Sequence, residues 1–265
     1  MINQITVNKL REMRLGTMAD ALKSQSGDEA YDTLSFDDRF GILVDAEWSK
    51  RRSVKLQKLI YNAGFAETKA CIEGIDYLPD RELDKSLILK LSSCTYINEG
   101  RHLILKGASG CGKTYLGCAF GNAACRSYIS VKYIRLPELL NDLVVARGEG
   151  TLKKVIASYR KVGLLILDEW LLKPLTTDQA MDLFEIIEAR TRRGSMIFCT
   201  QFDPRGWYDR IGTETDGTVS EAIIDRIKHN AYEIHMKGKI SMREYYGIQH
   251  QQTAEFDEEI NTPKD

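Results

Sequence analysis

Residues 107 to 114, Gly-Ala-Ser-Gly-Cys-Gly-Lys-Thr, fit the spacing G-x-x-x-x-G-K-[ST] and constrain the fold more than any other stretch of the chain. The apolar run 103–105 before them predicts a buried strand, and 115–125 after them predicts a helix. Glycines let backbone N–H groups converge on an anion, and the start of a helix adds the positive end of its dipole. This stretch therefore predicts a strand, loop and helix that bind a nucleoside triphosphate.

Each position of this loop has a predicted part in binding the nucleotide. Lys113 is expected to reach the β- and γ-phosphates, and the Thr114 hydroxyl is expected to ligate Mg²⁺. The full set of predicted contacts is Gly107, Ala108, Ser109, Gly110, Cys111, Gly112, Lys113, Thr114 and Tyr115. The pattern names no reaction, because kinases, transporters and motor ATPases all carry such a loop.

A second motif, Leu164-Leu-Ile-Leu-Asp168-Glu169, is an apolar strand followed by two acids. The simplest alternative is a buried strand with a charged end. If the acids lie beside the loop, Asp168 is expected to hold Mg²⁺, and Glu169 to orient and deprotonate a water that attacks the γ-phosphate. The adjacent pair favours hydrolysis over a kinase reaction. Thr200, at the end of another strand, is expected to position the same water, with Gln201 as the second choice.

The order of the predicted elements indicates an α/β fold, a parallel sheet flanked by helices. Nucleotides bind such sheets at the carboxyl ends of the strands. The predicted strands are 102–106, 130–135, 162–167, 195–200 and 231–236, and the helices between them are 113–127, 137–147, 151–159, 176–193 and 218–229.

Residues before 100 carry helical periodicity and no convincing strand signal. Gly16 is an expected break, Ser35 is an expected N-cap of a long helix that runs towards Gly64, and 82–91 is a further helix. We predict a small all-helical N-terminal domain over 1–66 that binds DNA or a partner, a helical connector over 67–100, an ATPase domain over 101–250 and a loose acidic tail over 251–265.

Charge limits where a nucleic acid can bind. The net charge of −1 excludes a generally cationic surface, so any contact must come from a local patch. The stretch 48–58 contains five cations and no acid, and a helix puts three of them on one face. A solvated face is the alternative to a DNA-binding one. The predicted DNA contacts are Lys50, Arg51, Arg52, Lys55 and Lys58, and the second choice is 148–161 with Lys153, Lys154, Arg160 and Lys161.

Other residue types point to no further site. The six cysteines and four histidines show no metal-binding spacing, and no apolar run is long enough to cross a membrane. We therefore expect a cytoplasmic protein with no membrane partner. Trp170 and Trp207 are expected to pack in the core rather than to stack on bases.

Taken together, these motifs resemble the IstB-type transposition helper ATPases, which are relatives of DnaC-type helicase loaders in the AAA+ superfamily. The resemblance covers about residues 5–247. Beyond the phosphate loop and the LLILDE strand, it includes four segments: KLREMRLGTMADAL, LSFDDRFGILVDAEW, LFEIIEARTRRGSMIFCTQFDPRGWY and AIIDRIKHNAYEIHMKGKISMRE. Cys111 departs from the family, which more often has threonine or another small residue there, and the family's C-terminal lid is minimal in this chain.

The resemblance implies ATP and Mg²⁺ as cofactors, and double-stranded DNA, a cognate transposase and further copies of the chain in an ATP-dependent ring or filament as partners. Arg226 matches the finger that reaches a neighbour's γ-phosphate, and Arg243 matches a sensor within its own subunit. Three alternatives stay open: a helicase loader, a small-molecule kinase, and a module that uses ATP only to assemble. Residues 34–48 favour the transposition helper over the loader.

Overall fold

The structure, a computed structural model, describes residues 4–191, 193–212, 217–238 and 240–247. The chain divides into two compact units, Met1–Lys58 and Leu59–Asp265. The predicted tail over 251–265 lies outside the described residues. No helix in the described part of the chain is both long and apolar enough to cross a membrane.

The first unit is helical. It contains α1 (Gln4–Glu12), α2 (Gly16–Gln25), the 3-10 helix η1 (Glu29–Tyr31) and most of α3 (Phe36–Ala63). The Ser35 hydroxyl accepts from the backbone N–H of Asp38, which confirms the predicted cap of the long helix. The small core consists of Val7, Leu10 and Ala19, with Leu15, Met18 and Leu22 packed against it.

The second unit begins with the end of α3 and a helical connector. The connector holds the 3-10 helices η2 (Ile72–Gly74) and η3 (Pro79–Arg81), then α4 (Lys85–Ser92) and α5 (Thr95–Asn98). As the sequence predicts, the described residues 4–98 contain no strand. The helix expected over 82–91 begins later because the Asp84 carboxylate caps it by accepting from the N–H groups of Ser86 and Leu87.

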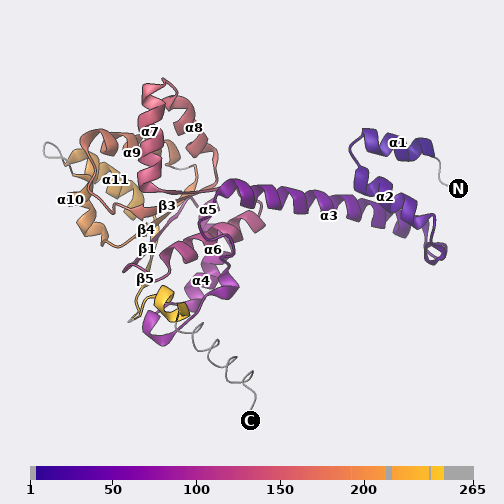
Figure 1. Cartoon of the computed structure of the whole chain (residues 1–265), viewed down its shortest axis with the longest axis horizontal. Coiled ribbons are helices and arrows are strands. Elements are labelled where there is room, and N and C mark those ends of the chain that lie inside the picture. Colours follow the sequence, from indigo (N-terminus) through magenta and orange to yellow (C-terminus); the bar gives the residue numbers. More distant parts are fainter. Residues whose placement is uncertain (1–3, 192, 213–216, 239, 248–265) are drawn as a thin grey trace, which may run out of the picture. The chain divides into compact units, whose positions relative to one another are not determined.

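A five-stranded parallel sheet forms the centre of this unit (Figure 1), in the order β2-β3-β4-β1-β5. The strands are β1 (His102–Gly107), β2 (Val131–Arg135), β3 (Leu164–Trp170), β4 (Ser195–Thr200) and β5 (Ala231–Met236). The predicted parallel α/β sheet is therefore confirmed. Because every strand is parallel, their carboxyl ends meet at one edge of the sheet.

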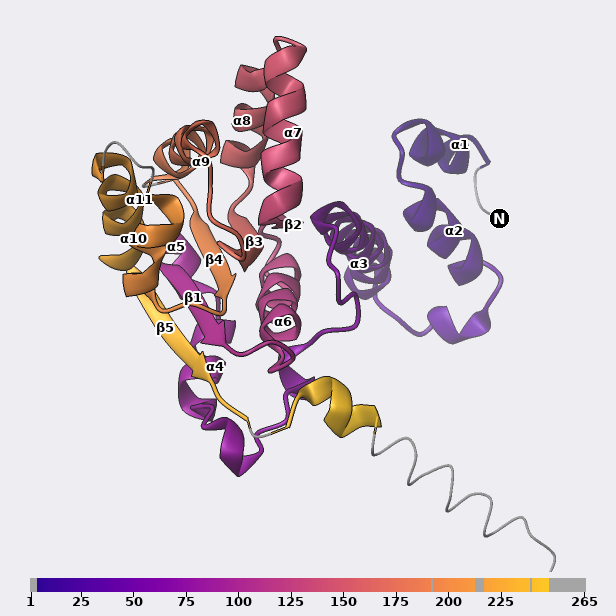
Figure 2. The same cartoon turned by 60° about the vertical axis from the view of Figure 1, so that its left-hand side comes forward.

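Helices cover both faces of the sheet (Figures 1 and 2). Alternate residues of β3 and β4, such as Leu167 and Phe198, share one core with α7 (Leu136–Gly148), α8 (Leu152–Lys161), α9 (Thr177–Arg190) and α11 (Thr218–Lys228). On the other face, α6 (Lys113–Arg126) approaches so closely that a Cβ on its Gly121 would lie 2.8 Å from Ile166. Side chains of a strand alternate between the two faces, and helices cover both faces here. The strands therefore contain continuous apolar runs.

Two local features differ from the prediction. Strand β3 starts at Leu164 rather than 162, and it continues past the acids to Trp170 through an irregularity at which Glu169 has a φ of +52°. Periodicity does not encode such a bulge. A 3-10 turn, η4 (Pro204–Trp207), and a short helix, α10 (Tyr208–Ile211), were not predicted. Trp170 and Trp207 are buried in the core in edge-to-face contact, as expected.

Candidate nucleotide site

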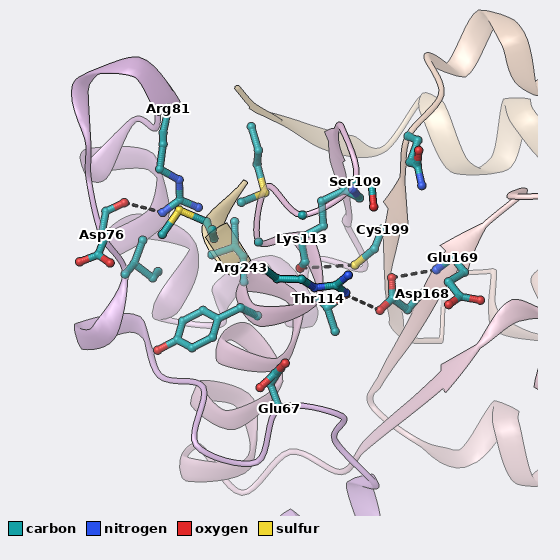
Figure 3. A pocket seen from close by; sticks show the side chains of 18 of the residues that line it. Glu67, Asp76, Arg81, Ser109, Lys113, Thr114, Asp168, Glu169, Cys199 and Arg243 are labelled. Carbon is teal, nitrogen blue, oxygen red and sulfur yellow. Dashed lines mark hydrogen bonds between the residues drawn. The ribbon is translucent and has the colours of Figure 1, made fainter. Parts of the chain in front are cut away.

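The phosphate loop connects β1 to α6 and forms one wall of a cavity of about 580 Å³ at the carboxyl edge of the sheet (Figure 3). Gly110 and Gly112 have φ values of +78° and +92°, which an L side chain rarely adopts. A Cβ on Gly110 would also lie 2.7 Å from the Ser241 side chain. The loop therefore needs glycine at these positions both for its backbone conformation and for space.

Lys113 is the first residue of α6 and lines the cavity. Its Nζ donates to the carbonyl oxygens of Gly107 at 2.8 Å and Ala108 at 2.6 Å, so the ammonium lies over the loop. Thr114, Tyr115, Ser109 and the two positive-φ glycines also line the cavity. Cys111 is buried in the loop, with its Sγ 3.8 Å from Lys113 Nζ.

The two acids of β3 reach the same cavity and differ in their surroundings. Asp168 is 5 % exposed, and its Oδ2 accepts from the Thr114 hydroxyl at 2.7 Å and the Tyr133 hydroxyl at 2.8 Å. Glu169 is more open, and its Oε1 lies 3.7 Å from a guanidinium nitrogen of Arg135. Both acids thus lie beside the loop, which is the position that the hydrolytic interpretation of the sequence requires.

Mg²⁺ fits this arrangement. The buried Asp168 carboxylate has hydroxyl partners but no salt bridge in the described part of the chain, and a buried charge without a counter-charge is costly. Together, Thr114 and Asp168 offer hard oxygen atoms at the edge of the cavity, which are the ligands that Mg²⁺ prefers.

Tyr133 is a site residue that the sequence analysis missed. It comes from β2 and is buried, and its pKa is raised by burial and by the neighbouring Asp168 carboxylate. The phenol therefore stays protonated and donates to the carboxylate. Its only signal in the sequence was its position near the end of a predicted strand that borders the acidic strand.

Thr200 does not reach the cavity. It is 1 % exposed, its hydroxyl lies within hydrogen-bond distance of the carbonyl oxygens of Trp170 and Phe202, and it accepts from the N–H of Phe202. Gln201, the second choice from the sequence, lines the cavity instead. Thr200 is the last residue of β4 and its hydroxyl binds the backbone that follows, whereas Gln201 comes directly after the strand, at the edge where the cavity lies.

The two predicted arginines lie in different places. Arg243 belongs to a helical turn over 242–247 after β5 and lines the cavity with Lys113 (Figure 3). Arg226 lies on α11, where it donates to Glu188 at 2.5 Å and to the Ala222 carbonyl, and it is not among the cavity's lining residues within the described part of the chain.

The cationic stretch of α3 is less available than its sequence indicates. Arg51 donates to Glu47 at 2.7 Å and to the carbonyl of Arg14 at 2.6 Å, and the Arg52 guanidinium lies 4.4 Å over the Trp48 ring. An acid one turn before it and a backbone carbonyl already bind the Arg51 guanidinium, so Arg51 is a weaker candidate for a phosphate contact than its sequence indicates, and DNA binding by this stretch stays a prediction. On α8 the side chains of Lys153, Lys154, Arg160 and Lys161 are exposed, as are those of the five cations of the α3 stretch.

Comparison with known proteins identifies the family. The model of the IstB-like ATP binding protein family matches residues 8–250, which is most of the chain. The chain belongs to the IstB-like ATP-binding protein family. It is 37 % identical over 241 residues to a protein of Sinorhizobium fredii, covering 90 % of this chain and 96 % of the relative, and 39 % identical over 201 residues to a protein of Pseudomonas fluorescens, covering 76 % and 87 %. Both relatives are named as ATP-binding proteins of insertion sequences.

Solved structures agree on the fold. The chain matches DnaI with a TM-score of 0.56 at 20 % identity, over 68 % of this chain and 94 % of that one. It matches AMPPCP-bound DnaA from Aquifex aeolicus with a TM-score of 0.54 at 19 % identity, over 66 % and 52 %. The IstB-like chain thus has the fold of a P-loop AAA+ protein, as the resemblance implied, and it is an ATP-binding ATPase.

Proposed function

We propose that this IstB-like ATPase assembles on double-stranded DNA in an ATP-dependent manner and assists a transposase, and that ATP hydrolysis ends the assembly. One observation carries the proposal: the loop, Asp168 and Glu169 line the same cavity in a chain whose relatives are named for insertion sequences. If the proposal is correct, the gene beside this one encodes a transposase. A neighbouring replication gene would instead favour a helicase loader.

Each residue has a separate part in the proposed hydrolysis. The loop amides and Lys113 bind the phosphates, while Thr114 and Asp168 would hold Mg²⁺. When bound, Mg²⁺ neutralises charge on the phosphoryl oxygens. Glu169 accepts a proton from the water that attacks the γ-phosphorus, as the bond between that phosphorus and the ADP oxygen breaks. Gln201 takes the water-positioning role first assigned to Thr200, because it lines the cavity.

Arg135 holds Glu169 through a long ion pair while also binding Glu138. In the proposed reaction Glu169 turns from Arg135 towards the water, while Arg135 keeps its ion pair with Glu138.

Arg226 is proposed to act on ATP bound by a second copy of the chain. Its position on α11 rather than in its own cavity is compatible with this role, and a guanidinium there would stabilise charge on the γ-phosphate. The Arg226→Ala protein is expected to bind ATP but hydrolyse it slowly. Mixing it with Lys113→Ala protein is expected to restore part of the turnover, because one intact joint site then forms; no restoration at any ratio would contradict action between subunits.

We propose the exposed cations of α8 as the first DNA contact to test, because Arg51 and Arg52 of α3 already have partners within the fold. We expect Lys153→Ala with Lys154→Ala to weaken DNA binding, and each lost phosphate contact to flatten the slope of log K against log salt by about one. Lys55→Ala with Lys58→Ala tests the α3 alternative, and Lys90→Ala with Lys173→Ala is the charge-matched control. A flatter slope only in the α3 variant would return DNA binding to the N-terminal unit.

A further inference from the structure

A buried arginine of the connector contacts the phosphate loop from outside it. Arg81, the last residue of η3, is 5 % exposed. Its Nη2 donates to the carbonyl oxygen of Cys111 at 3.0 Å, and its Nη1 donates to the carbonyl of Asp76 at 2.5 Å. Its backbone carbonyl accepts from the N–H of Lys237 at 3.2 Å, so η3 is also fixed to the chain after β5.

The contact with Cys111 determines which way one loop peptide faces. In a trans peptide the C=O and the following N–H point in opposite directions, and the described part of the chain has no cis peptide. Because the Cys111 carbonyl is turned to Arg81, the N–H of Gly112 is turned away from it. That N–H donates no hydrogen bond in the described part of the chain, and Gly112 lines the cavity.

The close approach of the guanidinium also favours glycine at position 112. Its φ is +92°, and a Cβ built there would lie 3.1 Å from Arg81 Nη2. The Arg81 guanidinium also lines the same cavity (Figure 3), and its Nε is buried without a partner within the described residues. A buried cation whose contacts are carbonyl dipoles makes the cavity more positive.

We propose that Arg81 is a positioning residue for ATP, which fixes the Cys111–Gly112 peptide so that the Gly112 N–H donates to a phosphate oxygen. The inference rests on the assignment of this loop as the ATP site. It goes beyond the loop motif, because Arg81 lies 30 positions before Cys111, in a connector that the G-x-x-x-x-G-K-[ST] pattern does not include.

The test is nucleotide affinity of Arg81→Met, with Arg126→Met as the matched control, since Arg126 pairs with Glu73 outside this cavity. Hydrogen bonds to charged groups are strong, so Arg81→Met is expected to bind ATP and ADP about 10- to 100-fold more weakly. Adenosine, which has no phosphate, is expected to bind Arg81→Met and wild-type protein with equal affinity. Arg81→Lys, which keeps one donor, is expected to lie between wild type and Arg81→Met.

Wild-type ATP affinity in folded Arg81→Met would overturn the proposal, as would an equal loss for adenosine, which indicates general damage to the cavity. A second measurement needs no variant. In ¹⁵N-labelled wild-type protein the Gly112 amide proton is expected to shift downfield when ATP is added, and an unchanged Gly112 signal in ATP-saturated protein would overturn the proposal. If wild-type protein bound no ATP at all, the site assignment itself would fail instead.

Discussion

The two edges of the parallel sheet both bury charged groups, yet they use them differently. At the amino edge, Arg190 is fully buried and donates to the carbonyl oxygens of Tyr159, Val162, Gly163 and Ser195. At the carboxyl edge, the buried Asp168 accepts from two hydroxyls and from the backbone N–H of Glu169, and it has no salt bridge within the described residues. At the first edge the charged group is bound by backbone carbonyls of the fold, whereas at the second the Asp168 carboxylate lines the cavity, where a bound cation can neutralise it.

This difference teaches that burial of a charge does not by itself mark a functional site. His102, at the amino edge, is also buried, and its Nδ1 accepts from the backbone N–H of Met196 at 3.2 Å. Burial, and then the nearby Arg190 charge, lower its pKa to about 4. Such a histidine stays neutral and holds two strands together. The predictions below separate the stabilising edge from the nucleotide-binding one.

The largest expected effect is the loss of ATP binding in Lys113→Ala. The loop then lacks the ammonium that the motif supplies for the β- and γ-phosphates. A calorimetric titration is expected to show no ATP binding, while the melting temperature without nucleotide stays within a few degrees of wild type. Unchanged ATP affinity would contradict the assignment of the loop.

Arg190→Met is expected to show the opposite pattern. Four carbonyl oxygens lose a buried donor, so the free energy of unfolding is expected to fall by about 3–5 kcal/mol in urea titrations. The fraction of Arg190→Met protein that stays folded is expected to bind ATP with wild-type affinity. Arg126→Met, at an exposed ion pair, is the control and is expected to change stability little. Loss of ATP affinity without loss of stability would break the comparison between the edges.

Acid is expected to weaken the amino edge through His102. Its pKa is about 4 in the folded state and 6.5 in the unfolded state, so the unfolded chain binds more protons between these values. The contribution is complete above pH 6.5 and is lost as the pH falls towards 4, by at most about 3 kcal/mol. In His102→Asn, whose amide oxygen can accept the same bond, urea unfolding at pH 7 and pH 5 is expected to show a smaller pH dependence; an unchanged slope would exclude His102 as the cause.

The smallest expected effect concerns Tyr133. Removing its hydroxyl in Tyr133→Phe leaves Asp168 with one fewer donor and less fixed in orientation. Outer partners of metal ligands typically contribute about 10- to 100-fold to affinity, and one neutral donor is expected to lie at the lower end. The Mg²⁺ concentration for half-maximal ATP hydrolysis is expected to rise, with melting temperature nearly unchanged. Tyr159→Phe, which removes a hydroxyl that donates to Asp142 away from this cavity, is the control.

The sequence predicted the residues of the carboxyl edge well because the spacing within each motif determines its local structure. Glycine spacing determines the loop, and a strand that ends in acids returns to the same edge of a parallel sheet. Residues that reach the site from distant segments have no motif in the sequence that marks them. Tyr133 and Arg81 reach the site only because β2 and η3 pack beside it. The cationic stretch 48–58 predicted DNA contacts less securely, because it does not include Glu47, which pairs with Arg51 in the structure.

The most direct test of the central claim is ATP turnover in Glu169→Gln, measured with ATP affinity on the same protein. The amide keeps the shape of the side chain but accepts no proton, so ATP is expected to bind with wild-type affinity while hydrolysis falls by about 100-fold or more. Wild-type turnover in this variant would contradict the account, because another group would then activate the water at the carboxyl edge.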